Sequence, residues 1–282
     1  MVADQLTRGA YGLTLTGPLS RHPALREVAL PCGRLSLTER PPSANQPMIF
    51  SPDRVQIGLA DGSYLDAVNA GGGLYRASLS GGLPRSLDDL VHPYLAPIAA
   101  LVHRWRGVPA LHGAALSNSH GAIGLIGQRE SGKSTTAEAL IDSGMWLLSD
   151  DLIVLEEHRV LPGPLSVDLR PAGAQLLQTS GDWVRGGERL RRLAPEPSIP
   201  AGATTLQLLV HLAFGPTTRV HPIPAAHRLT ALASQLYWPG IGSPARDLLE
   251  LTTIPQFIIE RPFGAQGLKQ TLQIVNGLIG EF

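Results

Sequence analysis

The segment from Gly127 to Ser134, GQRESGKS, matches the pattern G-x-x-x-x-G-K-[ST] and limits the fold more than any other part of the chain. An apolar run at 122–126 precedes it, and a helical pattern ending at Gly144 follows it. Glycine lets such a loop fold closely around an anion, and the first amides of the following helix point at the same place. A strand, a loop, a helix and a further strand in this order predict an α/β domain with a phosphate-binding loop (P-loop).

The loop and its first helical turn are the predicted nucleotide-binding residues. Lys133 is placed to pair with the β and γ phosphates, and the Ser134 hydroxyl is placed to coordinate Mg²⁺. The sequence therefore predicts ATP and Mg²⁺ as cofactors. The full set is Gly127, Gln128, Arg129, Glu130, Ser131, Gly132, Lys133, Ser134 and Thr135.

A second candidate group is the acidic pair Asp150-Asp151, which closes the apolar run at 145–148. A carboxylate at the end of a strand beside a phosphate loop can bind a metal ion or serve as the base for an attacking hydroxyl. Because adjacent strand residues point to opposite faces, only one of the two faces the γ-phosphate. Asp150 is favoured as metal ligand and base, and Asp151 stays open as the alternative.

Other polar residues allow two interpretations each. His112 lies among apolar residues of the strand before the loop strand, where a histidine is either structural or part of the site. The arginines form either a solvated face or a site for an anionic substrate. They are Arg170, Arg185, Arg189, Arg191 and Arg192.

The order of patterns predicts two parts. Residues 1–86 alternate β-like runs with turn signals, at 11–16, 28–37, 55–59 and 74–79, which indicates a small, mostly β N-terminal module. Residues 87–282 are predicted to form the α/β domain that carries the P-loop. It opens with a helix capped by Ser86, interrupted at Pro93 or Pro97 and ended by Gly107. Further strands are expected at 110–116, 145–148, 152–157 and 206–214, helices at 225–237 and 267–279, and a loop at 181–203.

Composition excludes several classes of protein. The 23 basic and 23 acidic residues cancel, so bulk electrostatic binding to nucleic acid or to an anionic membrane is not expected. No run of about 18 apolar residues and no signal-peptide pattern is present, and the single Cys32 suits a reducing cytoplasm. A homo-oligomer is compatible with the sequence, which does not fix the oligomeric state.

Taken together, His112-Gly113, GQRESGKS and Leu148-Ser149-Asp150-Asp151 resemble the C-terminal catalytic domain of bacterial HPr kinase/phosphorylase and its wider HPr-kinase-like family. The resemblance covers roughly residues 108–172. It implies a core like that of phosphoenolpyruvate carboxykinase, Mg-ATP on the loop, and transfer of the γ-phosphate to a serine hydroxyl. It also implies an acid of the Asp150-Asp151 pair as catalytic base and His112 close to the γ-phosphate.

The N-terminal 86 residues are similar in style to the short β module of smaller relatives, some of which phosphorylate serine on a lasso precursor peptide. Two features depart from the full-length enzymes. Thr135 stands where HPr kinases have glutamate, and the glycine-rich signature of phosphorolysis has only PLSVDLRPAG, at 164–173, as its nearest segment. The resemblance therefore predicts a serine kinase acting on a peptide or small protein, without extending to phosphorylase activity or to HPr. A small-molecule kinase and a nucleotide-binding module without transfer are the alternatives.

Overall fold

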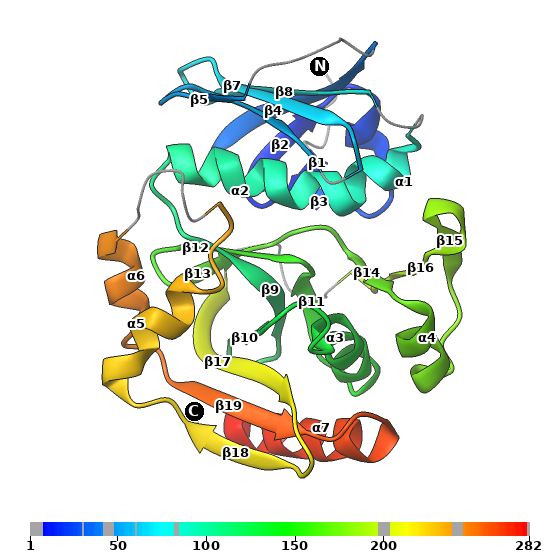
Figure 1. Ribbon diagram of the computed structural model, residues 1–282, viewed down its shortest axis with the longest axis vertical. Coiled ribbons are helices and arrows are strands. Elements are labelled where there is room, and N and C mark those ends of the chain that lie inside the picture. Colours follow the sequence, from blue (N-terminus) through cyan, green and yellow to red (C-terminus); the bar gives the residue numbers. More distant parts are fainter. Residues whose placement is uncertain are drawn as a thin grey trace, which may run out of the picture.

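The computed structural model describes residues 8–29, 31–41, 48–59, 61–81, 85–196, 204–238 and 245–280. Two eight-stranded sheets and one three-stranded sheet, with helices between and around them, make the protein a mixed α/β fold, as predicted. Figure 1 shows the first sheet at the top, helix α2 beneath it, and the second sheet below that helix. Among the described residues, no helix is long and apolar enough to cross a membrane.

The first sheet has the strand order β3-β1-β2-β4-β8-β7-β6-β5. Its three central strands, β2, β4 and β8, run parallel, and every other pairing is antiparallel. The four predicted runs correspond to β2, β4, β6 and β8, and β1, β3, β5 and β7 were missed. The strands are β1 (Arg8–Ala10), β2 (Leu13–Thr16), β3 (Arg26–Glu27), β4 (Gly33–Arg40), β5 (Ile49–Phe50), β6 (Arg54–Gly58), β7 (Tyr64–Asn69) and β8 (Leu74–Ser80).

The helical segment after this sheet begins and breaks where the sequence predicts. Ser86 and Asp89 form a capping box, with the Asp89 amide donating to Ser86 Oγ at 3.1 Å. After α1 (Leu87–Asp89), the irregular turn η2 (Leu90–Leu95) contains His92 in an extended conformation just before Pro93. Helix α2 (Ala96–Trp105) then packs into the apolar core of the first sheet. The division of the chain at residue 86 stays a prediction.

The second sheet closes on itself. Strand β10 pairs with β9 and also with β17, and the path β10-β9-β12-β13-β17 therefore forms a ring. Glycines permit the close approach, since a Cβ on Gly113 would lie 2.6 Å from the Leu125 carbonyl oxygen. The strands are β9 (Ala110–Ser117), β10 (Ala122–Ile126), β11 (Trp146–Ser149), β12 (Leu152–Glu156), β13 (Arg159–Leu161), β17 (Thr204–Phe214), β18 (Arg219–Pro222) and β19 (Gln256–Arg261).

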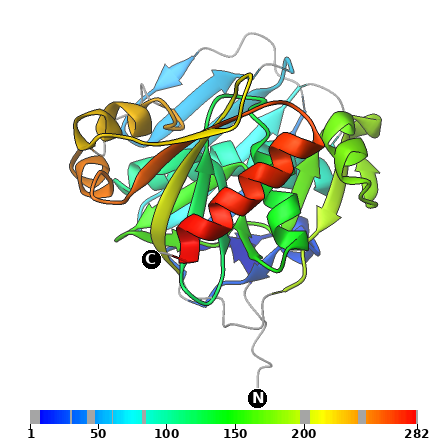
Figure 2. The same ribbon diagram turned by 90° about the horizontal axis from the view of Figure 1, so that it is seen from below.

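Helices cover the second sheet. Helices α3 (Lys133–Asp142) and α7 (Ala265–Gly280) share one apolar core with β9, β10 and β17, and Figure 2 shows them side by side on the same face. Helices α5 (Ala225–Ala233) and α6 (Ala245–Leu251) lie together at another edge. The predicted helix at 225–237 ends earlier than expected, because Leu236 forms a β-bridge with Leu111.

The expectation of a loop at 181–203 is wrong for its described part. Strand β16 (Arg189–Leu193) pairs with β14 (Ser166–Leu169) on one side and with β15 (Asp182–Val184) on the other, which forms the small third sheet beside helix α4 (Pro171–Leu177). The arginines of β16 pointed to a polar loop, yet Leu190 and Arg191 are buried. Residues 197–203 lie outside the described part of the chain.

Candidate functional site

A cavity of about 1110 Å³ lies over the start of helix α3. Its walls are the loop at 128–135, the turn η2, the β14–α4 segment, residues 185 and 189, and the ends of β17 and β19. The carboxyl ends of the parallel strands β10, β17 and β19 thus meet at this cavity, which is the usual place for a ligand in a sheet of this kind. The structure brings the predicted loop, His112 and Asp151 to this one cavity.

Backbone angles and close contacts both require glycine at the two glycine positions of the motif. Gly127 has φ 144° and Gly132 has φ 87°, both in the region that favours glycine. A Cβ on Gly127 would lie 2.5 Å from the Leu212 carbonyl oxygen, and a Cβ on Gly132 would lie 2.4 Å from the Arg261 guanidinium. Any larger residue at either position would therefore deform the loop.

Lys133 is buried at the start of α3 and holds the loop closed. Its ammonium donates to the carbonyl oxygens of Gly127 at 2.9 Å and Gln128 at 3.0 Å. Burial lowers the pKa of Lys133, and the charges of Asp150 and Asp151 oppose that effect. The positive group is thus fixed beside the loop amides, where an anion would gain most from it.

Arg261, at the end of β19, is linked to the loop through the hydroxyl of Thr136. Its guanidinium donates to Thr136 Oγ1 at 3.0 Å, and that hydroxyl donates to the Gly132 carbonyl at 2.9 Å. The side chain is only 2 % exposed and also lies over the Phe214 ring at 5.2 Å. Sequence analysis missed Arg261, because no local motif surrounds it.

Asp150 faces the start of α3. The Ser134 hydroxyl donates to Asp150 Oδ1 at 3.2 Å, so the two predicted metal ligands lie together. Burial raises the pKa of Asp150, and the neighbouring charge of Asp151 raises it further. Asp150 does not line the main cavity; it lines a small hollow of about 20 Å³ next to it.

Asp151 lines the main cavity, and unlike Asp150 it is paired with a histidine. Its carboxylate forms an ion pair with Nδ1 of His92, which comes from the turn η2. Burial alone would raise the pKa of Asp151, but the charge and hydrogen bond of His92 outweigh burial and hold the pKa well below its usual range. The two adjacent acids therefore have opposite tendencies: Asp150 retains a proton more readily and Asp151 stays ionised.

His92 was not identified from the sequence. Burial lowers its pKa, but the charge and hydrogen bond of Asp151 prevail, so the pKa lies above the ordinary value and the pair is ionic. The only sequence signal is the His92-Pro93 dipeptide at a predicted helix break, which marks a change of direction and no chemistry.

His112 lies behind the acids, on β9. Its Nδ1 is 3.1 Å from the Asp151 carbonyl oxygen, and its ring meets Tyr237 edge-on at 5.5 Å. Because a carbonyl only accepts, Nδ1 carries the proton. Burial and the charge of Lys133 lower the pKa of His112, which favours the neutral ring with Nε2 as an acceptor, and His112 lines the main cavity.

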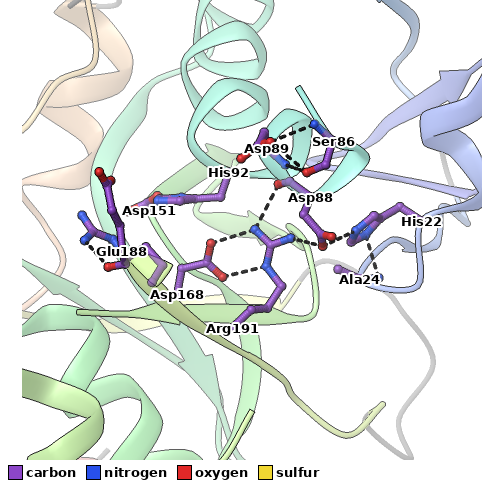
Figure 3. A network of polar contacts seen from close by, with 11 residues as sticks. His22, Ala24, Ser86, Asp88, Asp89, His92, Asp151, Asp168, Glu188 and Arg191 are labelled. Atoms are coloured by element: carbon purple, nitrogen blue, oxygen red, sulfur yellow. Dashed lines mark hydrogen bonds and ion pairs between the residues drawn. The ribbon is translucent and has the colours of Figure 1, made fainter. Parts of the chain in front are cut away.

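Two of the five arginines, Arg191 and Arg192, form ion pairs within the protein, which neither interpretation anticipated. Arg191 is buried and binds Asp168 through two bonds of 2.8 and 2.7 Å, and it binds Asp88 at 2.6 Å (Figure 3). Asp88 in turn lies 3.0 Å from His22 Nε2, so the network joins the third sheet to the first part of the chain. Arg192 pairs with Glu138 and Asp142. Both arginines are therefore structural.

The remaining three arginines line the cavity. Arg170 pairs with Glu130 of the loop at 2.8 Å, and Arg185 and Arg189 stand on the same wall. Burial lowers the pKa of Arg189, and the charges of Arg170 and Arg185 lower it further. Positive charge is thus crowded on the wall formed by α4 and β16.

The predicted magnesium site has oxygen donors in the right place. Within the described ranges, no group of three or more His, Cys, Asp or Glu side chains could enclose a metal ion. Mg²⁺ in nucleotide sites is commonly held by one or two protein oxygens, with phosphate oxygens and water completing its shell. Ser134 Oγ and Asp150 Oδ1, 3.2 Å apart, fit that kind of site.

Comparisons with known proteins give little guidance. No family model and no curated protein matches the chain. Among solved structures, it is similar to the Hpr(Ser) kinase/phosphatase from Coxiella burnetii, with 17% sequence identity and a TM-score of 0.29. That match covers 61% of this chain and 99% of the other. A likeness at this level is too low to assign a function, which has to come from the geometry of the site.

Proposed function

We propose that the protein is an ATP-dependent kinase that transfers the γ-phosphate of ATP to a serine hydroxyl of a peptide or small protein. One observation carries the proposal: Lys133 on its glycine loop, Ser134 and the Asp151–His92 ion pair line one cavity, and Asp150 contacts Ser134 at 3.2 Å from the adjoining hollow. Phosphoryl transfer needs positioning and charge neutralisation, and these groups supply both.

The loop would hold the nucleotide. The loop amides, the N-terminus of α3 and Lys133 present positive charge to the phosphates. Ser134 and Asp150 are the residues that would bind Mg²⁺, which neutralises charge on the phosphate oxygens when bound. In this arrangement Asp150 serves the metal side of the site.

Asp151 would hold the acceptor. It lines the main cavity, and His92 keeps its carboxylate ionised and fixed in direction. A carboxylate with a low pKa is a weak base, but it can orient a hydroxyl that loses its proton late in a loose transition state. The neutral His112 offers a second acceptor nearby. The sequence favoured Asp150 as both metal ligand and base. We propose instead that Asp150 binds the metal ion and Asp151 orients the acceptor hydroxyl.

A small-molecule kinase is the second candidate. Arg170, Arg185 and Arg189 line the same cavity, and such a cluster suits a small anionic acceptor as well as an acidic peptide. The resemblance of the sequence to peptide-modifying relatives favours the peptide, with a lasso precursor as the specific candidate.

Transfer of labelled γ-phosphate tests these functions. The full chain is incubated with labelled Mg-ATP and the peptide encoded beside its gene, and separately with a panel of small phosphorylated and carboxylated alcohols. Label on a peptide serine that is lost when this serine is replaced by alanine supports the proposal. Label only on a small molecule supports the second candidate. Nucleotide binding without label on any acceptor would indicate a binding module and contradict the proposal.

A further inference from the structure

Two exposed phenylalanine rings stand at the end of the cavity away from the acids. Phe214 is the last residue of β17, and Phe263 follows the end of β19. Their ring centroids are 5.6 Å apart with planes at 61°, and the residues are 44% and 73% exposed. Unlike the other large exposed apolar side chains among the described residues, these two rings contact each other and line the cavity, so they form an aromatic surface within the candidate site.

The pair is fixed against the glycine loop. A Cβ on Gly132 would lie 3.6 Å from Phe214 Cζ, so the ring lies next to the residue that opens α3. The Arg261 guanidinium also lies over the Phe214 ring, at 5.2 Å from its centroid, and Arg261 is held by Thr136 of α3. The ring is thus positioned by the same contacts that hold the loop.

The order of the strands gives the direction of a bound nucleotide. The loop strand β10 has β9 on one side and β17 on the other, and the acids follow β11, which pairs with β9. The phenylalanines follow β17 and β19 on the opposite side. A triphosphate whose last phosphate faces Asp151 therefore directs its nucleoside toward Phe214 and Phe263.

We infer that Phe214 and Phe263 form the binding site for the base of the nucleotide, an inference that rests on the proposed function. The rings line the same continuous cavity as the loop. An aromatic ring can stack on the flat face of any nucleobase, whatever polar groups the base carries at its edge. A purine, with the larger face, is the preferred occupant. Stacking of this kind raises affinity by about tenfold per base.

Binding measured by calorimetry in the presence of Mg²⁺ tests the site with two ligands, ATP and inorganic triphosphate. For the full-length variant Phe263→Ala we expect affinity for ATP to fall about tenfold, while affinity for inorganic triphosphate, which has no base, stays unchanged. Phe263→Trp should restore ATP binding. Phe50→Ala is the matched control, because Phe50 is 57% exposed on the first sheet, outside the cavity, and should change neither affinity.

A fluorescent nucleotide adds a readout that depends on stacking itself. The triphosphate of 2-aminopurine riboside should lose fluorescence on binding to the wild type and keep it on binding to Phe263→Ala. Unchanged ATP affinity in Phe263→Ala, or equal loss for ATP and inorganic triphosphate, would overturn the base site. So would a wild-type dimer that Phe263→Ala dissociates without a change in ATP affinity.

Failure of the proposed function has a different signature. Lys133→Ala should weaken ATP and inorganic triphosphate alike, because both use the loop. If the wild type binds neither ligand, both the kinase and the base site are wrong. If the wild type binds both ligands and Phe263→Ala binds them equally well, only the base site is wrong.

Discussion

The two large sheets of this protein contribute to the candidate site in different ways. The second sheet carries the recognisable motif, with the glycine loop after β10 and the acids after β11. The first sheet carries no such motif, yet the helical segment that packs on it supplies His92, the partner of Asp151. A sequence motif thus locates only half of this candidate site, and the other half comes from a region with no recognisable motif.

The first part of the chain also holds the acidic turn in place. The Tyr11 hydroxyl donates to the Asp150 carbonyl at 3.3 Å, and Arg26 donates to the Leu147 carbonyl at 3.1 Å. His103 of α2 lies 2.8 Å from the Tyr11 carbonyl oxygen. Residues of the first part of the chain and of α2 therefore support the acidic turn, and their contribution can be tested.

The largest effect is expected in the second sheet, from Lys133→Ala. Loss of the buried ammonium removes charge stabilisation of the phosphates and also frees the carbonyls of Gly127 and Gln128. We expect kcat/KM for transfer to fall by about 10³-fold or more, with weaker nucleotide binding. Wild-type turnover in this variant, measured with labelled ATP, would contradict the role given to the loop.

Asp150→Asn should come next. The change keeps the size of the side chain but removes the charge that faces Ser134. We expect kcat to fall by about 10²- to 10³-fold, and the Mg²⁺ concentration needed for half-maximal rate to rise. Asp142→Asn is the control, because Asp142 is an exposed acid at the end of α3; an equal loss there would point to general electrostatics.

His92→Ala tests the contribution of the helical segment that packs on the first sheet. In this variant Asp151 loses the positive charge that fixes its carboxylate. We expect kcat to fall about 10- to 100-fold with little change in KM for ATP. His92→Asn should recover part of the activity, since its amide can donate from the position of Nδ1. Equal activity of wild type and His92→Ala would reduce the first sheet to a scaffold.

The smallest effect concerns the seam between the two parts, at His103. This residue is 0% exposed, and burial lowers its pKa from 6.5 to about 3, with the charge of Arg106 adding to the shift. Below pH 6.5 His103 is therefore protonated in the unfolded chain but not in the folded chain, so the free energy of unfolding decreases as the pH falls. We expect about 1.4 kcal/mol per pH unit from this group.

Urea unfolding between about pH 7 and about pH 5 checks this expectation. His103→Gln can still donate to the Tyr11 carbonyl but cannot take up a proton, so its stability should depend less steeply on pH than that of the wild type. The same pH slope in both proteins would place the acid sensitivity elsewhere.

The parts of the site that could be predicted are those whose determinants are local. The loop needs glycine at 127 and 132 because of its own backbone angles, and Ser86 caps the helix that follows it. Arg191 was not assigned because its acidic partners lie 23 and 103 residues away along the chain. Phe214 and Phe263 come into contact because β17 and β19 pair, and no local sequence pattern predicts that pairing.

The contacts of Lys133 have a consequence for which anions the loop retains. An ammonium has three N–H donors, and two of them are already given to the carbonyls of Gly127 and Gln128. One donor is left for a phosphate oxygen, in a fixed direction. A lone orthophosphate gains a single bond from this lysine, whereas linked phosphates also collect the amides along the loop. Under the proposed function, the loop would therefore favour a linked phosphate chain over a single phosphate, because the longer chain reaches more of the loop amides.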